Sequence, residues 1–288
     1  MTLNEFNNLL KEEAKAQLAS CCGAEKWQQE MINNIPYTDE VSLLKNAQHT
    51  WYNVCTEQDW QEAFTHHPKI GDVQSLSEKF ASTMHLAGNE QQSVNNANAK
   101  TIQQLAAANK EYEVKFGLIF IVCATGKSAE EMLRLLNDRL TNSTQEELNI
   151  AMGEQAKITF LRLKKTLNDA DWSGIKPSQL TTHVLDTSIG KPGKDITIRM
   201  KRFDEGLWQT LAQGVTNDDG RIADLLPQGK ILHSGNYKLV FETRSYFEMQ
   251  KIKGFYPEVE IQFTVFDDNH YHVPLLINPF GYSTYRGS

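Results

Sequence analysis

The stretch Asn168-Asp169-Ala170-Asp171-Trp172-Ser173-Gly174-Ile175-Lys176-Pro177-Ser178-Gln179 divides the chain into two halves with different patterns. No proline occurs between Pro68 and Pro177, whereas six of the eight prolines lie from Pro177 onward. A long proline-free run with apolar residues three and four positions apart favours helix, and short alternating segments cut by Gly, Pro and Asp favour antiparallel strands. We therefore predict an all-α domain over residues 1–167, a linker over 168–178 and an all-β antiparallel sandwich over 179–288.

The 288 residues are enough for two domains of ordinary size, each with its own core. The whole formal net charge of -7 falls within residues 1–172, and 173–288 carry equal numbers of acidic and basic side chains. Neither half therefore offers the basic surface that nucleic-acid binding requires. The sequence shows neither a signal peptide nor a long apolar run, and its four cysteines lack a CxxC pattern. We expect a cytoplasmic protein with reduced cysteines.

Helical spacing of apolar residues predicts a series of helices in the first half. After a first helix that Thr2 caps, with Glu5 completing a capping box, they lie near 25–34, 39–54, 58–64, 74–86, 90–113, 128–141 and 144–167. The run Gly126-Lys127-Ser128 resembles the end of a P-loop, but that motif needs a glycine where the chain has Ile121, so we exclude nucleotide binding. We predict instead that a buried helix ends at Thr125 and Gly126, and that Ser128 caps the next one.

Two polar stretches of the first half could carry chemistry. His67 directly precedes Pro68, which restricts its backbone, and an imidazole titrates near neutrality, as general acid or base catalysis requires. The alternative is a helix-ending loop with surface histidines. Glu90 and Gln91 stand side by side at a helix start and could hold a polar, nitrogen-rich ligand. The alternative there is an ordinary first turn in which the helix dipole favours Glu.

Four segments of this half, taken in order, resemble one known family. They are His67-Pro68-Lys69-Ile70-Gly71, Glu90-Gln91, Lys115-Phe116-Gly117 with Ile121 to Gly126, and Glu154 followed by Ile158 and Arg162-Leu163. The set is similar to the decarboxylases of 2-oxo-4-hydroxy-4-carboxy-5-ureidoimidazoline (OHCU), which are all-helical and need no cofactor. The one departure is Ala87, where the family usually has Ser.

The resemblance implies a role for each matching residue. His67 would be the catalytic acid or base, and Glu90 its carboxylate partner. The implied substrate-binding residues are Pro68, Gln91, Ile121, Val122 and Arg162. An arginine can orient a carboxylate through a bidentate contact. Loss of CO2 beside an imine needs no metal, because the ring C=N can take up the electron pair.

The second half shows period-two alternation. Strands are expected at 180–186, 195–203, 208–215, 237–241, 259–265 and 270–277, with a short helix over 247–254. Polar residues inside this pattern are candidates for a site: His183 and His272 lie in mid-strand, and Arg221 follows a turn glycine. Together they could activate water and stabilise an oxyanion, although histidine on the solvent face of a strand is ordinary. No HExxH motif or close carboxylate accompanies them, so we predict no metal site.

The two ends of the second half resemble another family. Leu180 to Asp186 with Gly190-Lys191-Pro192, and Tyr271 to Leu276 with the final Tyr285-Arg286-Gly287-Ser288, are similar to the transthyretin-related 5-hydroxyisourate hydrolases. The resemblance implies that His183, Arg221, His272 and Ser288 are catalytic, and that Tyr285, Arg286 and Gly287 shape the pocket. It also implies a homotetramer with sites in a channel between subunits.

The two resemblances fall on consecutive reactions. They imply a bifunctional enzyme of urate breakdown, similar to allantoin synthases, which hydrolyses 5-hydroxyisourate to OHCU and decarboxylates OHCU to (S)-allantoin. The expected partners are these two small molecules and further copies of the chain, without cofactor, nucleic acid or membrane. Two alternatives remain: a transthyretin-like carrier with a helical interaction domain, and a chain in which only the hydrolase half is active.

Overall fold

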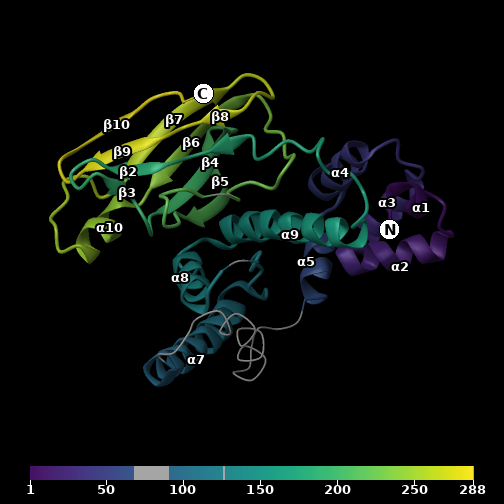
Figure 1. The fold of residues 1–288 in the computed structure, drawn as a ribbon, viewed down its shortest axis with the longest axis horizontal. Coiled ribbons are helices and arrows are strands. Elements are labelled where there is room, and N and C mark those ends of the chain that lie inside the picture. The colour runs from purple at the N-terminus through teal and green to yellow at the C-terminus, as the bar shows by residue number, and fades with distance from the viewer. Residues whose placement is uncertain (68–90, 126, 223, 288) are drawn as a thin grey trace. The chain divides into compact units, whose positions relative to one another are not determined.

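The computed structural model describes residues 1–67, 91–125, 127–222 and 224–287, without the side chains of 91–98 (Figure 1). Helices occupy the first half of the chain and strands the second, so the predicted fold class is confirmed. The chain forms two compact units. One contains Met1–Pro36 with His49–Asn168, and the other contains Tyr37–Gln48 with Asp169–Ser288. Within the described ranges, no helix combines the length and apolar character that a membrane crossing requires.

The helices of the first half follow the predicted order. They are α1 (Leu3–Asn7), α2 (Lys11–Cys21), α3 (Glu25–Asn33), α4 (Glu40–His49), the π-helical turn η1 (Thr50–Val54), α5 (Glu57–Thr65), α7 (Gln91–Phe116), α8 (Ala129–Arg139) and α9 (Thr144–Thr166). The Thr2–Glu5 capping box and the Ser128 cap are both formed, as predicted. The helix predicted over 74–86 lies outside the described residues.

The segment between α7 and α8 differs from its prediction. α7 ends at Phe116, and Gly117 follows with a φ of +67°, a left-handed conformation that favours glycine. Residues 118–125 are not helical, so the prediction that a helix ends at Thr125 is wrong. The segment is nevertheless buried over 120–123, because buried side chains bind its backbone groups in place of helical hydrogen bonds.

The described residues of the second half form a sandwich of two four-stranded sheets and one short parallel pair. One sheet has the order β10 (Gly281–Thr284), β9 (Leu275–Asn278), β2 (Val184–Asp186), β3 (Lys191–Pro192). The other has the order β5 (Leu207–Val215), β4 (Thr197–Asp204), β6 (Gly235–Phe241), β7 (Val259–Val265). The core takes residues from both sheets, including the predicted stripe of Ile196, Ile198 and Met200. α10 (Thr243–Met249) begins earlier than the helix predicted over 247–254 and lies at one end of the sandwich (Figure 1).

Two predicted strands are each divided in two. The segment 180–186 forms β1 (Leu180–Thr181) and β2, and the segment 270–277 forms β8 (Tyr271–His272) and β9. Pro274 lies at the second division and has no N–H to donate to a neighbouring strand. Most strand pairs are antiparallel, as predicted, but β1 pairs with β8 and β2 with β9 in parallel. The break between β1 and β2 therefore lies opposite the break between β8 and β9.

Candidate functional site

The sandwich brings two imidazoles and a guanidinium together where its strands divide. His183 lies between β1 and β2 and forms an antiparallel bridge with Arg221. Its carbonyl accepts a hydrogen bond from Leu275 N at 2.8 Å, directly across the division that follows His272. The Arg221 guanidinium lowers the pKa of both imidazoles, so the three predicted site residues lie close together.

A tight turn holds Arg221 in this place. Asn217 N donates to the Arg221 carbonyl at 2.8 Å, and Arg221 N donates to Asn217 Oδ1 at 3.0 Å. Gly220 has a φ of +68° and its carbonyl accepts from Val184 N at 2.8 Å. A Cβ at Gly220 would overlap the Val184 carbonyl, so only glycine brings the turn this close to the strand beside His183.

Both imidazoles favour the neutral form. Burial lowers the pKa of His183, and the nearby Arg221 guanidinium lowers it further. Burial also lowers the pKa of His272, followed by Arg221, His270 and His183. A neutral imidazole can accept a proton from water at neutral pH, and the guanidinium is placed to stabilise negative charge that develops nearby.

The C-terminal tail packs on one edge of the His272 ring. Gly287 bridges His272, and its N–H donates to the His272 carbonyl at 2.9 Å. A Cβ at Gly287 would overlap Cδ2 of His272, so a glycine is needed for this approach. The Arg286 guanidinium lies 5.3 Å from the centre of the Tyr271 ring, as in a cation–π contact. Tyr285 is exposed, and Ser288 lies outside the described residues.

The helical unit fixes His67 through a buried amide. His67 follows α5, and its Nε2 lies 2.6 Å from Oε1 of Gln155 on α9. The Gln155 Nε2 donates to Thr159 Oγ1 at 3.1 Å, which directs the amide oxygen toward the imidazole. Gln155 is fully buried on α9, so its amide cannot move freely and holds the His67 ring at a defined position. Pro68 and Glu90 lie outside the described residues, and Gln91 begins α7 without a described side chain.

Two buried ion pairs hold the segment that contains Ile121 and Val122. Arg139 Nη1 donates to the Ile121 carbonyl at 2.8 Å, and its Nε donates to Glu147 Oε1 at 2.8 Å. Cys123 N donates to Glu154 Oε2 at 2.7 Å, while the other oxygen of Glu154 pairs with Lys157. Charged groups at these depths are stable only when paired and hydrogen-bonded. The backbone of this segment is therefore held firmly against α8 and α9.

Arg162 lies on the same face of α9 as Gln155. The spacing of seven residues corresponds to two helical turns. The side chain is half-buried, and its Nη1 lies 3.4 Å from the Cys21 carbonyl. The structure thus places a guanidinium two turns along the helix from the amide that holds His67.

Two family models match the chain. An OHCU decarboxylase model matches residues 7–164, more than half of the chain, and a HIUase/Transthyretin family model matches residues 180–287. The chain belongs to the OHCU decarboxylase family and carries a HIUase/Transthyretin family domain after it. Both resemblances drawn from the sequence are confirmed.

Similar proteins include one that spans nearly the whole chain. The uric acid degradation bifunctional protein TTL of Arabidopsis thaliana is 31% identical over 93% of this chain and 96% of its own length. The 5-hydroxyisourate hydrolase of Salmonella typhimurium is 42% identical over 38% of this chain and 80% of its own length. A crystal structure of (S)-allantoin synthase covers 100% of both chains at 24% identity, with a TM-score of 0.45.

Two side chains that contact the site histidines were missed by the sequence analysis of this OHCU decarboxylase family member. Gln155 contacts His67, and Thr181 contacts both His272 and His270. A partial signal was present for Gln155, which lies seven residues before Arg162. For Thr181 no local signal existed, because its partners are about ninety residues away along the chain.

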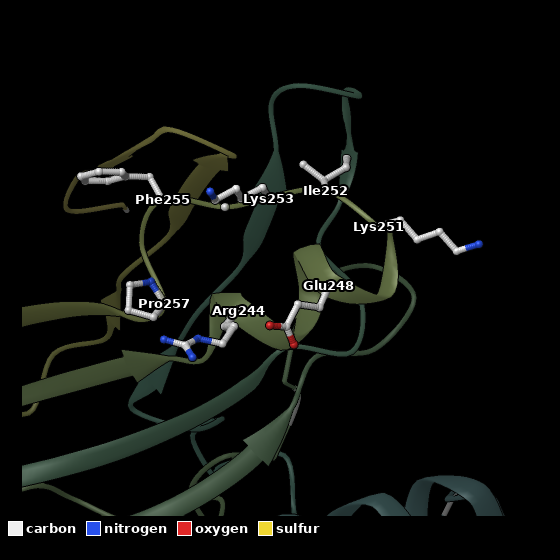
Figure 2. A pocket seen from close by; sticks show the side chains of 8 residues that line it. Arg244, Glu248, Lys251, Ile252, Lys253, Phe255 and Pro257 are labelled. Atoms are coloured by element: carbon white, nitrogen blue, oxygen red, sulfur yellow. The ribbon is translucent and has the colours of Figure 1, made fainter.

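A surface pocket beside α10 contains none of the predicted site residues (Figure 2). It is lined by Arg244, Glu248, Lys251, Ile252, Lys253, Gly254, Phe255 and Pro257. Figure 2 shows Arg244 and Glu248 projecting from the helix, while Lys251 points away from the pocket. Its charged side chains are exposed, and no histidine is among its lining residues. Among the described residues, no group of three or more His, Cys, Asp or Glu could hold a metal ion.

Proposed function

We propose that the chain converts 5-hydroxyisourate to (S)-allantoin in two steps. The sandwich hydrolyses 5-hydroxyisourate to OHCU, and the helical half decarboxylates OHCU. The two family matches and the bifunctional Arabidopsis relative support this reading. The observation that carries it is the grouping of His183, Arg221 and His272 with the C-terminal tail at one place in the sandwich.

In the hydrolysis, water attacks the amide carbonyl of the substrate ring. His272 accepts the proton of the attacking water, and Arg221 stabilises the oxyanion that forms on the carbonyl oxygen. The C–N bond then breaks, and the imidazolium returns its proton to the leaving ring nitrogen. His183 and Ser288 complete the catalytic set, and Tyr285, Arg286 and Gly287 shape the pocket.

In the decarboxylation, the C–C bond to the carboxylate breaks and its electron pair enters the ring C=N. Arg162 orients the carboxylate before it leaves as CO2. His67, with Glu90 as its partner, removes the neighbouring hydroxyl proton or delivers a proton to one face of the product. Pro68, Gln91 and the backbone of Ile121 and Val122 contact the substrate. Because His67 is held by Gln155, proton delivery from one side would give a single enantiomer.

The proposed assembly is a tetramer formed through the sandwich, in the cytoplasm. β10 forms one edge of its sheet, and its residues are largely exposed. Phe280, Tyr282 and Tyr285 lie at this edge with exposures of 74%, 44% and 59%. An exposed edge strand with apolar side chains is suited to pairing with another chain. The transthyretin-like family of the sandwich supports the same arrangement.

Circular dichroism on fresh 5-hydroxyisourate with the purified chain tests the proposal. We expect rapid loss of the substrate and a lasting signal of (S)-allantoin, without added metal. Rapid loss with racemic product would leave only the hydrolase half active. No acceleration over spontaneous decay would refute the proposal and favour a carrier.

A further inference from the structure

Three hydrogen bonds connect His272 with Thr181 and with His270, a histidine that the proposed mechanism does not use. His270 Nδ1 lies 3.1 Å from the Ser178 carbonyl. His270 Nε2 lies 3.0 Å from Thr181 Oγ1, and Thr181 Oγ1 lies 2.9 Å from Nδ1 of His272. The parallel register of β1 and β8 pairs Thr181 directly with His272, which puts the hydroxyl beside the ring.

The direction of all three hydrogen bonds follows from the first one, in which the acceptor is the Ser178 carbonyl. A carbonyl only accepts, so His270 Nδ1 carries a proton toward Ser178. In a neutral ring the other nitrogen of His270 then has a lone pair and accepts from the Thr181 hydroxyl. A hydroxyl has one proton, so Thr181 must accept from Nδ1 of His272. The proton of neutral His272 is thereby placed on Nδ1, and the lone pair on Nε2.

We propose that Thr181 and His270 are positioning residues, which fix the tautomer of His272 so that its Nε2 is the base that takes the proton of water. The proposal rests on the proposed hydrolase activity. When Nε2 gains that proton, Nδ1 keeps its own and still donates to Thr181, so no hydroxyl or imidazole has to rotate during the reaction. The ring is also held at its Cδ2 edge by Gly287. Thr181 and Gly287 together restrict the orientation of the His272 ring.

The surroundings of His272 suit a neutral hydrogen-bond partner at Nδ1. Burial lowers the pKa of His272 most, the neighbouring Arg221, His270 and His183 lower it further, and a hydrogen bond with the Thr181 backbone partly offsets this. A carboxylate at Nδ1 would fix the same tautomer but would raise the pKa of the imidazole. A hydroxyl fixes it without adding charge, so the base stays neutral.

The first test replaces the hydroxyl. Thr181→Val keeps the shape and removes the acceptor, and we expect kcat for 5-hydroxyisourate hydrolysis to fall by about 10²-fold with little change in KM, the lower end of a general base contribution. Thr181→Ser retains the hydroxyl and should stay within about threefold of the wild type. Thr182→Val is the matched control, because that neighbouring hydroxyl donates to the Val273 carbonyl and not to a site histidine. His270→Phe should cost about tenfold, since Thr181 is then free to donate to Nδ1.

A second readout does not depend on rates. In ¹⁵N spectra of the wild-type chain, neutral His272 should show the Nδ1–H form, and in Thr181→Val it should shift toward Nε2–H. Thermal unfolding of each variant reports whether the sandwich is still folded, and OHCU decarboxylation reports the same for the helical unit. A wild-type chain that hydrolyses 5-hydroxyisourate while His272 carries its proton on Nε2, or a Thr181→Val variant with wild-type kcat, would overturn the proposal. A wild-type chain with no hydrolysis would instead refute the proposed function.

Discussion

Gly287→Ala should inactivate the hydrolase without unfolding the protein. A Cβ at position 287 would lie 3.1 Å from Cγ and 3.2 Å from Cβ of His272, and closer still to Cδ2. The backbone cannot withdraw without breaking the hydrogen bond from Gly287 N to the His272 carbonyl, at 2.9 Å. Carbon atoms in contact lie about 3.5 Å apart, so the ring or the tail must move by roughly 1 Å.

A displacement of roughly 1 Å at a reacting group can cost about 10²-fold in rate, or about 2.7 kcal/mol of transition-state stabilisation. We therefore expect kcat/KM for 5-hydroxyisourate to fall by about that factor in Gly287→Ala. The assay follows loss of the fresh substrate against its spontaneous decay. OHCU decarboxylation by the same variant should be unchanged, because the helical unit does not contain the tail.

Gly281→Ala provides the matched control in the same tail. A Cβ there would meet only Asn278, at 3.5 Å and beyond, which is ordinary contact, and the residue has no positive φ. It should hydrolyse 5-hydroxyisourate as the wild type does. If Gly287→Ala matched this control, the tail would not hold His272 and the reasoning from the overlap would be refuted.

Three further changes test the charges and amides of the two halves. Arg221→Met removes a cation that lowers the pKa of both site histidines, so the acid limb of kcat/KM for hydrolysis should move to higher pH, in addition to a loss of kcat. Gln155→Leu leaves His67 without its buried amide partner, and we expect kcat for decarboxylation to fall by about tenfold or more in a stopped assay on OHCU. Arg139→Met leaves a buried carboxylate unpaired and frees the Ile121 carbonyl, so the free energy of unfolding, measured with denaturant, should fall by about 3–5 kcal/mol.

For each of these three variants, one result would contradict the reasoning. An acid limb that stays in place in Arg221→Met would mean that burial alone sets both imidazole pKa values. For Gln155, the control is Gln28→Leu, which removes another buried amide of the helical unit, one that donates to the Cys22 carbonyl. Equal losses of decarboxylation in both variants would point to stability and not to His67. An unchanged unfolding free energy in Arg139→Met would refute the view that this ion pair holds the segment.

The sequence predicted the helices and strands better than it predicted the contacts between them. Helix and strand periods are local, and they located most helices and the longer strands, with α10 shifted by a few residues, whereas the short strands β3 and β10 were not predicted. The parallel pairs β1–β8 and β2–β9 could not be foreseen, because they join segments about ninety residues apart. The failure at Thr125 has the same cause. Its segment looked helical in composition, but Arg139 and Glu154 satisfy its backbone from distant positions.

The same distinction separates the site residues that the sequence identified from those it missed. His183, Arg221 and His272 interrupt a pattern of alternating strands, and they match family motifs, so each was visible by itself. Thr181 did not break the alternating strand pattern, because threonine is common in strands. Gln155 was equally inconspicuous on a helix. Their roles exist only through contacts with a histidine that tertiary structure brings to them.

Both halves hold a histidine through a neutral oxygen atom in the same way. His67 meets the amide oxygen of Gln155 at 2.6 Å, and His272 meets the hydroxyl of Thr181 at 2.9 Å. Each partner is neutral and is itself held by a further hydrogen bond, to Thr159 and to His270 respectively. A neutral oxygen fixes which ring nitrogen carries the proton without the rise in pKa that a carboxylate at the same nitrogen would bring. It follows that Gln155→Glu, which puts a carboxylate at that place, should move the His67-dependent limb of the decarboxylation pH profile upward, whereas Gln155→Leu should lower kcat without moving it upward. A profile that Gln155→Glu leaves in place would mean that His67 does not titrate in the rate-limiting step.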